Sequence, residues 1–100
     1  MAVVEVSIVP IGIATTSLSG YVATALEVLR GSNVQYELTA MGTILSGDLD
    51  DVLAVVRRMH ESLFAKGAPR VLTQIKIDDR RDRVGSPRQK VQSVLDKLQE

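Results

Sequence analysis

The chain opens on the stretch AVVEVSIVPI at residues 2–11, and this stretch constrains the fold more than any other. Its side chains alternate between an aliphatic side, formed by Val4, Val6 and Ile8, and a more polar side, formed by Glu5, Ser7 and Val9. An alternation with period two is typical of a strand in a sheet with two unlike faces. We therefore predict a strand over residues 2–11.

A helical pattern follows this strand after a loop rich in Gly, Thr and Ser. Aliphatic side chains recur at helical spacing at Val22, Ala25, Leu26 and Leu29. Gly31 stands where a helix end favours a left-handed residue. Ser17 or Ser19 could cap the start of the helix, and the pattern does not choose between them.

Two strands and a second helix come next. We predict a strand over residues 34–41, with Tyr36 and Leu38 in the core, and a short strand over 43–46 after a tight connection at Gly42. Asp48 is the predicted N-cap of a helix that ends at Gly67. The apolar stripe of this helix comprises Leu49, Val52, Leu53, Val56, Met59, His60 and Leu63.

The last third of the chain predicts a strand over residues 70–78, a charged turn and a C-terminal helix. Ser86 is the expected N-cap of that helix, Pro87 its first residue and Gln89 the partner in a capping box. The helix carries an apolar stripe formed by Val91, Val94, Leu95 and Leu98.

The resulting order is βαββαβ plus a C-terminal helix. Two helices covering one face of a four-stranded antiparallel sheet form the ferredoxin-like α+β sandwich, and right-handed crossovers leave few rivals. A length of 100 residues fits one domain over residues 1–100. The core of so short a chain is thin, and an aromatic content of 3% leaves aliphatic residues to build it, so we expect a homo-oligomer.

Composition excludes several classes of function. The formal net charge of +0 disfavours nucleic acid or an anionic membrane as the main partner. The chain has no Cys and no signal-peptide pattern, so we expect a cytoplasmic location and no thiolate metal site.

His60-Glu61 begins like a zinc-protease motif, but Phe64 replaces the second histidine. The single His lies on an apolar stripe, so we expect it to be packed at the edge of the core. With one His and no Cys, the chain offers no complete nucleophile–base set, so we expect no enzyme.

The sheet face away from both helices is the first candidate site. Its expected members are Glu5, Ser7, Val9, Glu37, Thr39, Met41, Gln74 and Lys76. This face is either a solvated surface with cross-strand Glu–Lys pairs or a polar ligand site or subunit interface. A second candidate is the run Asp78-Asp79-Arg80-Arg81-Asp82-Arg83, which is either a solvated turn or a clamp for a partner or ligand.

Several segments together resemble a known family. These are VEVSIVPIG at 4–12, YVA at 21–23, YELTAMGT at 36–43, HESLF at 60–64 and IKIDDRRD at 75–82. Nearly the whole chain is similar to the small thiamine-binding protein family, which is ferredoxin-like and related to the YkoF proteins. The resemblance implies binding of thiamine or its hydroxymethylpyrimidine portion by a homodimer or homotetramer, without catalysis and without a further cofactor.

With thiamine as the implied ligand, the candidate residues acquire roles. Glu37 and Glu5 could pair with its cationic ring, and Ser7, Thr39 and Thr43 could supply hydroxyls. Met41 could contact a ring, Ser17 and Ser19 could present polar groups at a helix start, and Gly42 belongs to the matching motif. The set of candidate ligand-binding residues also includes Asp78, Asp79 and Arg80, whose charged groups could clamp a ligand. The alternative is a regulatory or oligomerisation module whose open sheet face serves assembly only.

Overall fold

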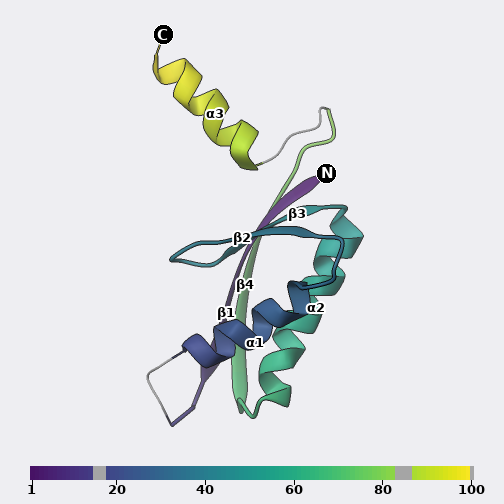
Figure 1. Ribbon diagram of the computed structural model, residues 1–100, viewed down its shortest axis with the longest axis vertical. Helices are drawn as coiled ribbons and strands as arrows, with labels where there is room; N and C mark the ends of the chain where they lie inside the picture. Colours follow the sequence, from purple (N-terminus) through teal and green to yellow (C-terminus); the bar gives the residue numbers. More distant parts are fainter. Residues whose placement is uncertain (15–17, 83–86, 100) are drawn as a thin grey trace.

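The computed structural model describes residues 1–14, 18–82 and 87–99 (Figure 1). It contains four strands and three helices, in the order β1 Ala2–Ile11, α1 Ser19–Leu29, β2 Gln35–Leu38, β3 Thr43–Gly47, α2 Leu49–Ala65, β4 Arg70–Asp79 and α3 Pro87–Leu98. The strands form one sheet in the order β2-β3-β1-β4, and every neighbouring pair is antiparallel. This is the predicted ferredoxin-like topology with an added C-terminal helix.

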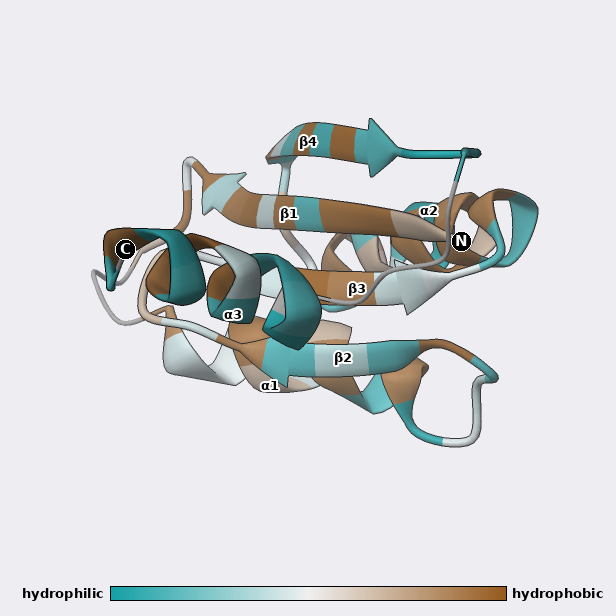
Figure 2. Cartoon of the chain, turned by 90° about the horizontal axis from the view of Figure 1, so that it is seen from above, coloured by the Kyte–Doolittle hydropathy of each residue, from teal (hydrophilic) through white to brown (hydrophobic). Residues whose placement is uncertain are grey.

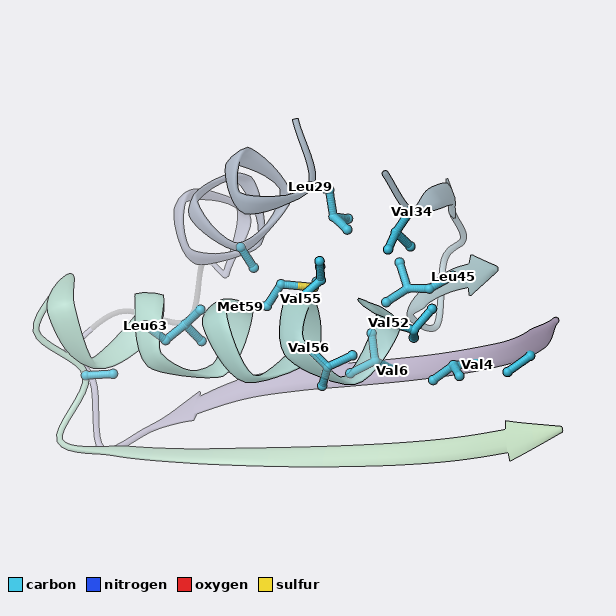
Figure 3. Close-up of a cluster of buried hydrophobic side chains, with 13 residues drawn as sticks. Val4, Val6, Leu29, Val34, Leu45, Val52, Val55, Val56, Met59 and Leu63 are labelled. Carbon is cyan, nitrogen blue, oxygen red and sulfur yellow. The ribbon is translucent and has the colours of Figure 1, made fainter. Parts of the chain in front are cut away.

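The alternation along β1 positions the core. Val4 lies opposite Leu45 of β3 and Ile77 of β4, and Val4 and Leu45 are both fully buried. Figure 3 shows their side chains on the side of the sheet where the helices lie. The core cluster is completed from β1, α1, α2 and the loops by Ala2, Val6, Ala25, Leu29, Val34, Val52, Val55, Val56, Met59, Leu63 and Ala68.

The helix ends follow local sequence signals, with one exception. The side chain of Asp48 accepts hydrogen bonds from the backbone N–H groups of Asp50 and Asp51, which confirms the predicted N-cap of α2. Gly31 has a φ of 76°, as a left-handed residue after α1 requires. Of the two residues that could cap the start of α1, Ser19 is excluded, because Leu18 occupies the N-cap position and Ser19 is the first helical residue. Ser17 and Ser86 lie outside the described residues.

Three predicted core assignments, two on β2 and one on α2, also need correction. The second strand covers only residues 35–38, and Tyr36 and Leu38 are 47% and 55% exposed. They lie on the helix side, opposite Leu45 and Thr43, but β2 is an edge strand that neither helix covers fully. On α2, Leu53 is exposed and Val55 is buried in its place. The reason is that α2 packs against α1 as well as the sheet, which turns its buried face toward Val55.

The third helix extends away from the rest of the molecule (Figure 1). A contact between Lys90 and Asp78 joins its first turns to the end of β4. Figure 2 shows that hydrophobic and hydrophilic positions both occur along α3, yet the apolar stripe that begins at Val91 is exposed. The radius of gyration is 15.2 Å, whereas a compact chain of this length has about 13 Å. None of the described helices is long and apolar enough to cross a membrane.

Candidate functional site

The central strand is longer than one of its two neighbours. β4 pairs with β1 along its full length, as far as Ile11, but the pairing with β3 ends where Val6 lies opposite Thr43. Among the described residues, β1 therefore has no strand partner on the β3 side beyond Val6. Backbone N–H and C=O groups at such an edge are available to another binding partner.

A groove of about 190 Å³ lies at this unpaired edge. One wall is the edge of β1, a second is the connection between β2 and β3, and α1 and one residue of α2 close the helix side. The residues that line the groove are Val6, Ser7, Ile8, Val9, Leu18, Val22, Ala25, Leu26, Leu38, Thr39, Ala40, Met41, Gly42, Thr43 and Met59. Segments far apart in the sequence therefore meet at one end of the sheet.

Gly42 brings the β2–β3 connection against β1. A Cβ atom at this position would lie 2.8 Å from the carbonyl oxygen of Val6, so only glycine allows the approach. The same geometry shows that the Val6 carbonyl points toward the connection. Since the backbone groups of alternate residues in a strand point the same way, the N–H and C=O groups of Ile8 also face the groove.

The hydroxyl group of Thr39 shapes the β2–β3 connection. It donates to the Gly42 carbonyl oxygen at 2.9 Å and accepts from the N–H groups of Gly42 and Met41 at 3.2 and 3.3 Å. The Thr39 N–H also donates to the Gly42 carbonyl oxygen, at 2.8 Å. These bonds end β2 at Leu38 and close the turn, so the hydroxyl acts within the turn.

The groove is lined by aliphatic, thioether and small polar side chains. Within the described part of the chain, none of its lining residues carries a charge. Thr43 and Met59 are buried at its base, whereas Met41 is 84% exposed at its rim. Such a lining suits a small, flat and uncharged ring, which aliphatic walls sandwich and backbone groups bind at the edge.

The predicted carboxylates lie on the other face of the sheet. Glu5 and Glu37 both stand opposite Ile44, one on each side of it, and Lys76 lies opposite Glu5 on β4. Neither carboxylate lines the groove. They are not equally distant from it, however, because the Cγ atom of Glu5 lies 3.8 Å from the place where a Gly42 Cβ would be. Glu5 therefore flanks the groove, and Glu37 lies one strand further out than β3.

The charged run at the end of β4 is a separate region. Asp78 and Arg80 line a second cavity of about 650 Å³ that is shared with Met1, Val3 and residues of α3. Two ion pairs here are local: Arg80 donates to Asp82 at 2.5 and 2.9 Å, and Arg81 donates to Asp79. The hydrogen bond from Arg81 lowers the pKa of Asp79 below its usual value. Since Asp79 pairs with Ala2, the run lies several residues along β1 from the groove.

The remaining sequence candidates lie apart from the groove. Ser19 begins α1 but does not line the groove, and Ser17 falls outside the described residues. His60 packs at the edge of the core, where its Nδ1 lies 2.7 Å from the Thr73 hydroxyl and its ring meets Phe64 edge-on at 5.3 Å. These contacts agree with the structural role predicted for His60.

Five predicted residues thus come together, namely Ser7, Thr39, Met41, Gly42 and Thr43. Sequence reasoning missed the apolar wall, which is formed by Leu18, Val22, Leu26, Leu38 and Met59. A usable signal was present: a strand predicted over ten residues beside one predicted over four must leave part of its edge unpaired.

Comparisons with known proteins agree with this fold. The family model described as thiamine-binding protein matches residues 4–95. A UPF0045 protein from Methanothermobacter thermautotrophicus is 46% identical over 99 residues, covering 98% of this chain and 100% of the relative. The crystal structure of protein MJ1052 from Methanocaldococcus jannaschii superposes with a TM-score of 0.85 at 36% identity, covering 93% of this chain and 94% of that one.

A more distant structure shares the fold alone. It is a Thermotoga maritima protein described by the words thiamine biosynthesis/salvage, with a TM-score of 0.77, 20% identity and coverage of 93% of this chain and 97% of that one. The match of the family model over most of the chain, together with the relatives above 30% identity, assigns the family. The chain belongs to the thiamine-binding protein family.

Proposed function

We propose that a homo-oligomer of this chain binds thiamine, or the free hydroxymethylpyrimidine, without catalysis, and that the groove at the β1 edge holds the pyrimidine ring. The observation that carries the proposal is the unpaired edge of β1 beside Gly42. An aminopyrimidine has donors and acceptors along one edge, and a strand edge presents both kinds of group in a row. Membership of the family supports the choice of ligand.

The lining supports the pyrimidine half over the thiazolium half. Placing the cationic ring among uncharged walls would remove it from water without a counter-charge, which is costly. In addition, a groove of about 190 Å³ is smaller than the usual ligand cavity of about 300–1,000 Å³ and suits one ring better than two. The thiazolium would therefore extend past the rim.

Glu5 is the carboxylate nearest to that rim. Its side chain passes beside Gly42 on the outer face of the sheet, whereas Glu37 lies beyond Ile44 on the edge strand. We accordingly assign the charge contact first expected of Glu37 to Glu5. Glu37 then serves as a control, since it lies in the same row of the same face but is exposed and stands one strand further from the groove.

The test is titration calorimetry with thiamine and with neutral hydroxymethylpyrimidine. Replacing Thr43, which is buried at the base, with Val keeps its shape and removes its hydroxyl, so Thr43→Val should weaken both ligands about fivefold to tenfold. Glu5→Gln should weaken thiamine about tenfold or more and leave the pyrimidine unchanged. Glu37→Gln should change neither.

A wild-type protein that binds neither ligand would contradict the proposal and favour the alternative of an assembly module. Thr43→Val with unchanged affinity for both ligands would place the ligand elsewhere. Ser46→Ala is the matched control for Thr43→Val, because Ser46 is a buried hydroxyl residue of the same strand away from the groove. The expectations of a cytoplasmic location and of no nucleic-acid partner stay predictions.

A further inference from the structure

The two edges of the sheet differ in length and in polarity. The edge strand β2 has four residues, whereas the edge strand β4 has ten. On the helix side of β4, Ile75 and Ile77 are 43% and 48% exposed, and Leu72 is equally exposed on the other side. A long edge strand with exposed aliphatic side chains is a template for pairing with another strand, and native proteins usually cover or shorten it.

A second copy of the chain can supply that strand only in certain registers. In a continuous antiparallel sheet, opposite residues share a face, so a symmetric pair of β4 strands must be centred on one residue that lies opposite itself. Each possible centre therefore fixes which side chains meet. Like charges placed directly opposite one another destabilise the pair, and opposite charges stabilise it.

Two registers set opposite charges against each other, namely those centred on Ile77 and on Gln74. The register centred on Ile77 would set Lys76 against Asp78 but would pair only residues 75–79 of β4. The register centred on Gln74 pairs residues 70–78 and is therefore preferred. It places Arg70 of each copy opposite Asp78 of the other, and it places Val71 opposite Ile77 on the helix side. Centring on Thr73 would set Lys76 against Arg70, and centring on Lys76 would set that lysine against itself. Centring on Ile75 would continue the ladder into Arg70 against Arg80. At the centre of the preferred register, Gln74 lies opposite Gln74 of the second copy, and neither side chain carries a charge.

Both charged groups of the preferred register are accessible. Arg70 and Asp78 are exposed, and the Oδ2 atom of Asp78 contacts Lys90 of its own chain. A carboxylate has a second oxygen and several acceptor sites, so Asp78 can accept from Arg70 of the second copy while it keeps Lys90. This pairing would make Asp78 a contact to a partner, which is one of the two roles that the sequence left open for the charged run at residues 78–83.

We propose that β4 of this chain pairs antiparallel with β4 of a second copy, centred on Gln74, so that the two four-stranded sheets become one continuous sheet. The proposal rests on the self-association in the proposed function and not on the binding of thiamine. The groove lies at the β3 side of β1, and β4 lies at the other side of β1. Ligand binding and this interface can therefore fail separately.

The register is tested by disulfide formation, because the chain has no native Cys. Gln74→Cys should form a covalent dimer on mild oxidation, since the two Cα atoms of opposite residues lie within about 4.5–5.5 Å of each other. Lys76→Cys, two residues away on the same face, and Gln35→Cys on the β2 edge should stay largely uncrosslinked. Equal crosslinking of the three variants, or crosslinking of Gln35→Cys alone, would overturn the interface.

Charge reversal gives a second measurement that does not depend on oxidation. Arg70→Asp should raise the dimer dissociation constant at least tenfold in sedimentation experiments, because like charges then face each other twice. The double variant Arg70→Asp with Asp78→Arg should restore association. A wild-type protein that is monomeric at micromolar concentration, or a double variant no better than the single one, would overturn the proposal. Calorimetry with thiamine on Arg70→Asp shows whether the groove remains intact.

Discussion

The helices α2 and α3 carry similar apolar stripes but meet different surroundings. On α2 the stripe residues Val52, Val56 and Met59 are at most 3% exposed, whereas Val91 and Leu98 of α3 are 60% and 77% exposed. Both stripes have the period of an amphipathic helix. The period of an apolar stripe therefore predicts a helix and the side that it can bury. Burial itself requires a neighbouring surface, which the period does not specify.

The two helices also differ in how their own chain supports them. α2 packs between the sheet and α1, and its N-terminus is capped by Asp48. α3 has only 12 residues and is joined to the body at its first turns by the exposed contact between Lys90 and Asp78. Isolated helices of about 12–15 residues are marginal in water, so α3 depends on further packing for most of its stability.

The largest effect is expected from Val52→Ala in α2. The side chain is fully buried, and losing two methyl groups costs about 0.8 kcal/mol each plus a cavity term. Since Ala is also the better helix former, we expect a net loss of roughly 1.5–3 kcal/mol in the free energy of unfolding. Chemical denaturation measures it, and a loss below about 0.5 kcal/mol would show that the core relaxes around this position.

A much smaller effect is expected from Val91→Ala, which makes the same chemical change in α3. The helix-propensity gain is the same, and little burial is lost at a side chain that is 60% exposed. The free energy of unfolding should therefore change by less than about 0.5 kcal/mol in either direction. A loss comparable to that of Val52→Ala, at concentrations where the protein self-associates, would show that the stripe of α3 is covered in the native assembly.

The smallest effect at neutral pH is expected from Asp79→Asn, at the junction between the body and α3. The hydrogen bond from Arg81 lowers the pKa of Asp79 in the folded protein, so this pair stabilises the fold above the unfolded pKa of about 3.9. That contribution is lost as the pH falls below 3.9 through the folded pKa.

Acid unfolding followed by circular dichroism provides the measurement for this pair. Asp79→Asn should show a shallower loss of stability than the wild type below pH of about 4, and nearly the same stability at pH 7, because an exposed pair is well screened. Asp82→Asn provides a comparison, since Asp82 forms the other ion pair of this turn, with Arg80. Parallel acid transitions for the wild type and Asp79→Asn would contradict the pKa shift.

Much of the fold was predictable because it depends on neighbours along the chain. The alternation around Val4 and Val6 forces one side of β1 inward, Asp48 satisfies the first amides of α2, and Gly31 takes a conformation that other residues avoid. The order of the elements then leaves few topologies. The second strand was predicted too long, because it ends at Leu38, and Thr39 and Met41 lie in the connection to β3.

Tertiary structure determined what lies next to what. The groove exists because β1 continues after its pairing with β3 ends at Val6, and the apolar wall behind it comes from α1 and Met59. The register of β2 against β3 places Glu37 on the face away from the groove, and the edge position of β2 exposes Tyr36. Period and capping are local properties that the order of residues carries directly. Register, strand pairing and cover depend on contacts between segments far apart in the chain, and these form only when the whole domain folds.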